Sequence, residues 1–208
     1  MEILKRAATL VIIITALQVK SAFSQADATI MKAFSTSYSE ELKVNYTSAV
    51  KAISSVYNEK SYEMNLRLGW LYYLLKNYTV SANYYQKAVN LKNKAIEARF
   101  GVVKPLASLE SWDRVMEQYD AILKSDPQNV QARYWKGMIY YNRKQYELSK
   151  QQFVKVITLY PFDYDSNHMM GWACLMLGKK AEAKSFFSQT LMVKPGDVSA
   201  MDGLNRSK

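Results

Sequence analysis

The stretch that decides the fold runs from Val130 to Asp163 and reads VQARYWKGMIYYNRKQYELSKQQFVKVITLYPFD. Its apolar residues follow the three- and four-residue spacing of an amphipathic helix. The same spacing occurs upstream, where residues 62–75 and 78–91 each fit one helix and the polar link Lys76-Asn77 separates them. Two helices joined by so short a link are predicted to lie antiparallel, as a helical hairpin.

A period of 34 residues carries this hairpin along the chain. Prolines recur at this spacing at Pro127, Pro161 and Pro195, and aromatic residues at Tyr85, Tyr119, Phe153 and Phe187. Glycines fall on the same period at Gly69, Gly137 and Gly171. Three residue types on one period predict stacked copies of a two-helix unit, each of which buries its apolar face against the next.

The unit 130–163 resembles the tetratricopeptide repeat. That family has characteristic large, glycine, small, aromatic and proline positions, which are held here by Tyr134, Gly137, Tyr140, Tyr146, Ser149, Phe153 and Pro161. The resemblance covers about residues 30–197. It implies an all-α fold, an α-solenoid of antiparallel helix pairs, in which the first helices line a concave face where ligands commonly lie.

The period divides the chain into segments. We expect a signal peptide at 1–24, an N-terminal segment at 25–29, a divergent unit at 30–61, regular units at 62–95, 130–163 and 164–197, a divergent unit at 96–129 and a capping helix at 198–208. In the capping helix, Val198, Met201 and Leu204 are predicted to cover the last apolar face, because terminal repeats need a polar outer side.

Small residues are predicted to bring the two helices of a unit together. Gly69 and Gly137 should face Ser81 and Ser149 across their helix pairs, because small side chains permit close approach. The unit 96–129 departs from this pattern, since Pro105 lies inside its first helix. A kink is expected there, with Gly101 absorbing the distortion.

The N-terminus has the pattern of a secretory signal. Lys5 and Arg6 precede the apolar run AATLVIIITAL, and Ala22 and Ser24 are small residues at the positions that signal peptidase requires. We expect cleavage before Gln25 and export to the periplasm, the cell envelope or the extracellular space. The alternative is an uncleaved anchor, for which the apolar run is short. The net charge of +10 is scattered over the chain and is interpreted mainly as solvated helix faces.

Steps of three and four residues along the first helices select one stripe as a candidate binding surface. It contains Phe34, Tyr38, Leu66, Trp70, Tyr73, Phe100, Lys104, Tyr134, Met138, Tyr141, His168 and Trp172. Two interpretations stay open: the rings pack between neighbouring first helices, or they form an aromatic groove for a peptide or partner helix. A clamp for a terminal carboxylate is not supported, because the stripe offers mainly Lys104 and Asn142.

The sequence gives little basis for catalysis. His168 is the single histidine, and no phosphate loop, zinc-protease motif or nucleophile elbow occurs. Cys174 is predicted to be a buried thiol, and carboxylates such as Glu41 and Asp163 are interpreted as helix-face or N-cap residues. No metal site and no cofactor are expected.

These observations predict a non-catalytic scaffold or adaptor that binds a protein or peptide. An accessory subunit of an envelope machine, for polymer export or outer-membrane assembly, is the alternative, and membrane-associated complexes fall within both. Nucleic acid is not expected as a partner, because export separates the chain from it.

Overall fold

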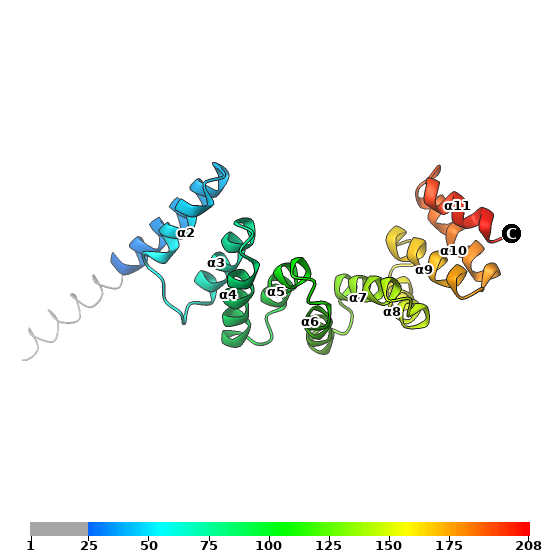
Figure 1. Cartoon of the computed structure of the whole chain (residues 1–208), viewed down its shortest axis with the longest axis horizontal. Helices are drawn as coiled ribbons and strands as arrows, with labels where there is room; N and C mark the ends of the chain where they lie inside the picture. Colours follow the sequence, from blue (N-terminus) through cyan, green and yellow to red (C-terminus); the bar gives the residue numbers. More distant parts are fainter. Residues whose placement is uncertain (1–24) are drawn as a thin grey trace, which may run out of the picture. The chain divides into compact units, whose positions relative to one another are not determined.

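The computed structural model describes residues 25–208, which fold into helices with short connections and contain no strand (Figure 1). A helix at 25–42 comes first. It is followed by α2 (Tyr46–Ser54), α3 (Tyr62–Leu74), α4 (Tyr78–Leu91), α5 (Ile96–Ser108), α6 (Trp112–Ser125), α7 (Val130–Asn142), α8 (Tyr146–Leu159), α9 (Tyr164–Met176), α10 (Lys180–Val193) and α11 (Val198–Arg206). The predicted all-α fold is confirmed, whereas the predicted signal peptide at 1–24 lies outside the described residues.

The helices repeat the period seen in the sequence. Helices α3, α5, α7, α9 and α11 begin 34 residues apart, and so do α4, α6, α8 and α10. Residues 25–29, expected to be a separate N-terminal segment, belong to the first helix. Pro105 does not shorten α5, which has the same 13 residues as α3.

The chain divides into two compact units, one up to Leu109 and one from Glu110. In the first unit, α4 packs against both α3 and α5, and α2 packs against α3. In the second unit, α8 packs against α7 and α9, and α10 packs against α9 and α11. Helices α4, α8 and α10 therefore each cover two successive first helices, which is how stacked repeats bury a shared core.

In α4, α8 and α10 an aromatic ring is packed against the first helices. A Cβ atom placed on Gly69 would lie 2.8 Å from the ring of Tyr85, and one on Gly101 in the next first helix would lie 2.3 Å from it. The Ser81 hydroxyl donates to the Gly69 carbonyl at 2.7 Å. The predicted Gly–Ser packing is therefore confirmed, and Gly101 has a packing role that its assignment to the proline distortion had missed.

The second unit repeats this arrangement twice. Phe153 lies against Gly137, where an added Cβ would come within 2.8 Å of the ring, and Ser149 donates to the Gly137 carbonyl at 2.9 Å. Phe187 lies between Gly171 and Gly203 in the same way. Both phenylalanines are fully buried, so their rings have little room to move aside.

The predicted capping helix is present as α11, but its buried face differs from the expected one. Val198 is 77% exposed and Met201 is 40% exposed, and of the three predicted residues only Leu204 packs against the core cluster. Ala200 and Gly203 are buried instead. The reason is steric: α11 approaches Phe187 so closely that only small residues fit between them.

The turn between the two helices of each repeat contains one residue in the left-handed region. These residues are Val44, Lys76, Glu110, Lys144 and Gly178, with φ between 53° and 72°. Only one of them is glycine, the residue that adopts this conformation without a steric penalty. The shared turn includes the divergent first repeat, whose second helix, α2, has 9 residues where α4 has 14.

The packing of Phe153 predicts the effect of enlarging Gly137. Gly137→Leu should lower the free energy of unfolding by about 1–3 kcal/mol, because the new side chain overlaps a ring that cannot move away. Chemical denaturation followed by circular dichroism measures this loss. Gln131→Leu, at an exposed position of the same helix, is the matched control, and equal stability of the two variants would contradict the packing.

Candidate functional site

The first unit contains a cavity of about 750 Å³ lined by residues of the 25–42 helix, α3, the residue after α4 and the first turn of α5. Four residues of the predicted stripe line it: Phe34, Tyr38, Leu66 and Trp70. Tyr38 is 54% exposed, and Leu42 beside it is 87% exposed. The sequence-predicted stripe is thus brought together here, in part, around an accessible and largely apolar hollow.

One wall of this cavity is built around a buried cation, Arg67. Its guanidinium is ion-paired with Glu41, donates from Nε to the Ser37 hydroxyl at 3.0 Å, and lies 3.8 Å from the centre of the Tyr38 ring. Glu41 also accepts a hydrogen bond from the Trp70 indole at 2.7 Å. A buried charge needs such partners, so this network holds the Tyr38 ring against Arg67 and ties Trp70 to the same carboxylate.

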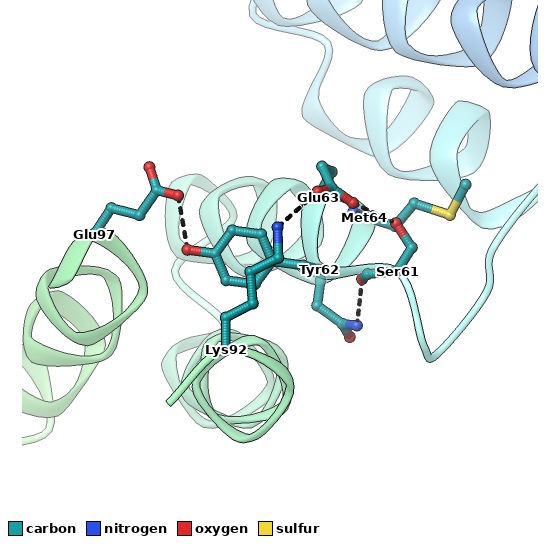
Figure 2. Close-up of polar contacts among 7 residues, drawn as sticks. Ser61, Tyr62, Glu63, Met64, Lys92 and Glu97 are labelled. Carbon is teal, nitrogen blue, oxygen red and sulfur yellow. Dashed lines mark hydrogen bonds and ion pairs between the residues drawn. The ribbon is translucent and has the colours of Figure 1, made fainter. Parts of the chain in front are cut away.

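A second polar cluster lies where α3 and α5 begin (Figure 2). The Tyr62 hydroxyl donates to Glu97 at 2.7 Å, and Lys92 crosses the face of the Tyr62 ring at 4.2 Å to pair with Glu63 at 3.2 Å. Burial, followed by the hydrogen bond to Glu97, raises the pKa of Tyr62, so this phenol stays protonated as a donor. The cluster ties the two first helices together at one edge of the cavity.

Three more stripe residues lie in the first unit. Tyr73 stacks on Trp70 with ring centres 5.8 Å apart, and the Lys104 ammonium lies 4.7 Å from the Trp70 ring centre. Phe100 is half-buried. Trp70 is therefore the meeting point of this part of the stripe, between the buried Arg67 network and the exposed lysine.

In the second unit the stripe residues pack against the protein core. Tyr134, Met138, Tyr141 and Trp172 are half-buried and contact the cluster that contains Phe153 and Phe187. The packing interpretation therefore accounts for these four residues, and the open hollow that stripe residues line belongs to the first unit.

His168 belongs to a contact between α9 and α11. Its Nε2 accepts a hydrogen bond from the Trp172 indole at 3.2 Å and lies 2.9 Å from the Ser199 hydroxyl. The Tyr164 ring stacks on the imidazole, and the Tyr164 hydroxyl donates to Asp197 at 2.7 Å. The same indole N–H lies 3.2 Å from the Ser199 hydroxyl, so Trp172, His168 and Ser199 form one hydrogen-bonded group, in which an unprotonated Nε2 can accept from the indole.

A second cavity, of about 660 Å³, lies outside the predicted stripe. It is lined by Val130, Leu159, Tyr160, Pro161, Phe162 and Asp163. Tyr160 and Phe162 are 57% and 68% exposed. Sequence reasoning missed it because this loop was interpreted only through the helix-ending role of its proline, although two aromatic residues beside an exposed turn were a visible signal.

Cys174 and Asp163, two side chains with reactive or metal-binding groups, make structural contacts. Within residues 25–208, no group of three or more His, Cys, Asp or Glu residues could hold a metal ion. Cys174 is fully buried, as predicted, and burial raises its pKa to about 11. Asp163 is the predicted N-cap of α9, since it accepts from the Ser166 backbone N–H at 2.8 Å.

Sequence reasoning also missed most polar residues of the first cavity. Glu41 was interpreted as a helix-face or N-cap residue, and Arg67, Lys92 and Glu97 were not selected. One signal was available for Arg67: it occupies the repeat position that holds Gly101 and Gly203, both of which are packed against rings. An arginine at a position that is buried in other repeats predicts a nearby partner for its charge.

Comparison with known families identifies the repeats. Models of the tetratricopeptide repeat match residues 62–95 and 116–164. The chain therefore contains tetratricopeptide repeats. None of the curated proteins compared with it gives a match.

Solved structures with the same repeat fold match most of the chain. A tetratricopeptide repeat protein from Parabacteroides merdae matches with a TM-score of 0.75 and 17% identity, over 86% of this chain and 72% of that one. MamA matches with a TM-score of 0.71 and 17% identity, over 80% of this chain and 92% of that one. MamA from Desulfovibrio magneticus RS-1 matches at 0.69 and 14%, over 82% and 97%. At these identities the likeness is one of fold.

The His168 contact predicts a pH dependence of stability. Burial lowers the His168 pKa below its ordinary value of 6.5, with Lys194 acting in the same direction and Asp197 and Asp165 opposing. The unfolded chain then binds the proton more readily, so the stabilisation is complete above the ordinary pKa and is lost as pH falls through the lower folded-state value.

Thermal unfolding at about pH 7.5 and about pH 5 should therefore show a lower melting temperature at the acidic pH. His168→Gln keeps a hydrogen-bond acceptor without a titrating group, and its melting temperature should change less over the same interval. An identical drop in both proteins would assign the pH dependence to other groups.

Proposed function

We propose that this chain is a non-catalytic interaction scaffold that binds a peptide or a partner helix in the cavity of its first unit. Tetratricopeptide repeats are in general protein-interaction modules without catalytic activity, and the repeat models matched by this chain support that coarser role. The observation that carries the finer proposal is the accessible hollow between Phe34, Tyr38, Leu66 and Trp70.

The dimensions and composition of this hollow support side-chain binding. Its volume of about 750 Å³ falls within the several hundred cubic ångströms typical of ligand pockets. Aromatic residues and arginine, which contribute most strongly to binding at protein interfaces, line it. Their hydrogen bonds and ring contacts hold Tyr38, Arg67 and Trp70 in place before binding, which reduces the entropy lost on association.

The same proposal includes a location for the protein, in the cell envelope or outside the cell. The charged start, the apolar run and the small residues at Ala22 and Ser24 favour export, and hence a partner in the cell envelope or outside the cell. Among the described residues, no helix is long and apolar enough to cross a membrane.

The binding proposal predicts a selective effect of two truncations. Tyr38→Ala and Trp70→Ala should each reduce recovery of the partner when the chain is purified from its native host and co-purifying proteins are quantified by mass spectrometry. Trp135→Ala removes a 47% exposed ring outside the cavity and should leave recovery unchanged. Equal recovery with all three variants would refute binding in this cavity, and the recovered partners would separate a general adaptor from a subunit of an export or assembly machine.

The export proposal predicts the N-terminus of the mature protein. Peptide sequencing of the protein isolated from its host should begin at Gln25, and Ala22→Arg should block this processing because signal peptidase needs a small residue there. A mature protein that retains residues 1–24 would contradict cleavage and favour the anchor.

A further inference from the structure

The charged side chains that line the first-unit cavity are paired, with one exception. Arg67 pairs with Glu41, and Lys92 pairs with Glu63 at 3.2 Å. Glu97 is an exposed carboxylate that lines the cavity and accepts a hydrogen bond from the neutral Tyr62 hydroxyl. Within residues 25–208 it has no ion-pair partner, so the charged residues that line the cavity leave one negative charge uncompensated.

The position of Glu97 explains how this unpaired charge is tolerated. Glu97 lies in the first turn of α5, where the helix dipole favours a negative charge. The N-cap residue of α5, Ala95, supplies no side-chain hydrogen bond. Figure 2 shows the Glu97 carboxylate above the start of its helix, with one oxygen directed to Tyr62. The helix stabilises the anion without neutralising it, and a cation from outside can still pair with it.

The cavity beside this anion is apolar. Phe34, Leu66 and Trp70 line it together with the exposed Tyr38. Lysine and arginine combine a hydrocarbon stem with a charged end group, and they commonly bury the stem along apolar surface while the end group meets water or an anion. We infer that the binding cavity proposed above takes a lysine or arginine side chain of a protein partner, with its stem against Leu66 and Trp70 and its cation on Glu97.

An acidic side chain fits the same cavity less well. Arg67 already has Glu41 as its partner, and its Nη2, although it has no hydrogen-bond partner, is buried away from the surface. Lys92 is occupied by Glu63. An entering carboxylate would also meet the unpaired Glu97, and like charges at close range are unfavourable.

Lys104 sets the orientation of the entering side chain. Its ammonium lies over Trp70, and no carboxylate in the described part of the chain pairs with it. Glu97 and Lys104 are seven residues apart on α5, roughly 10 Å along a helix. Lys104 does not line the cavity, but its charge beside Trp70 repels a cation, so an entering cation is drawn towards Glu97 and away from Lys104.

Selection from a displayed library of random short peptides tests this inference with the protein purified from its host. Peptides that bind the unmodified protein should be enriched in lysine or arginine next to apolar residues. Synthetic copies should bind Glu97→Gln about tenfold more weakly, the effect expected for a charge-assisted contact. Replacing the peptide's basic residue with norleucine should cause the same loss on the unmodified protein and little further loss on Glu97→Gln.

Two controls separate charge from folding. The glutamine oxygen in Glu97→Gln can still accept the Tyr62 hydrogen bond, and an unchanged melting temperature verifies that the helices remain packed. Glu59→Gln removes an exposed carboxylate of the same unit that does not line the cavity, and it should bind the peptides as the unmodified protein does.

The outcomes distinguish this inference from the proposed function on which it rests. Peptides whose binding requires Trp70 but shows no basic preference, or is unaffected by Glu97→Gln, would overturn the inference and leave the aromatic cavity as a binding site. Enrichment of acidic peptides would also overturn it. A library that yields no peptide dependent on Tyr38 or Trp70 would count against both.

Discussion

The structure depends on one repeated contact, an aromatic ring laid against the backbone of a glycine. Phe187 lies between Gly171 and Gly203, and Tyr85 lies between Gly69 and Gly101. A ring in this position touches two successive first helices and sets the distance between them. Protein interiors are packed too densely for that distance to vary, so the ring also determines which residues of the first helices meet.

The cavity of the first unit arises where this contact is replaced. When the shorter first repeat is aligned on the shared turn, with Val44 matched to Lys76, its ring position holds Ile53. The facing position in α3 holds Arg67 in place of glycine. A buried guanidinium requires compensation, which Glu41, Ser37 and the Tyr38 ring provide from the preceding helix. The polar network that shapes the cavity is thus a local substitute for the ring and glycine used elsewhere.

Much of the fold could be predicted from sequence because its determinants are local and periodic. The spacing of apolar residues and the 34-residue period placed α3 and α4 to within one residue. The buried face of α11 was predicted wrongly, because the largest apolar residues were assumed to point inward although the nearby Phe187 admits only small ones. Gly101 and Gly203 occupy the same repeat position three periods apart, and that spacing would have revealed the correct face.

The binding site was less predictable, for a different reason. Its aromatic members lie on one stripe and follow from helical geometry. Its charged members do not: Arg67 pairs with Glu41 across 26 residues, and Glu97 is linked to Tyr62 across 35. Such pairs depend on how neighbouring helices are aligned, and no short-range pattern in a single sequence specifies that alignment.

The left-handed turns have a consequence for the backbone strain of the repeats. A side chain in this conformation costs on the order of 1 kcal/mol, a penalty that Val44, Lys76, Glu110 and Lys144 carry and Gly178 does not. The α9–α10 hairpin therefore closes its turn at the lowest conformational cost, and the hairpin closed by the β-branched Val44 at the highest. In an array built from one repeated contact, the repeats thus differ in the strain that their turns hold.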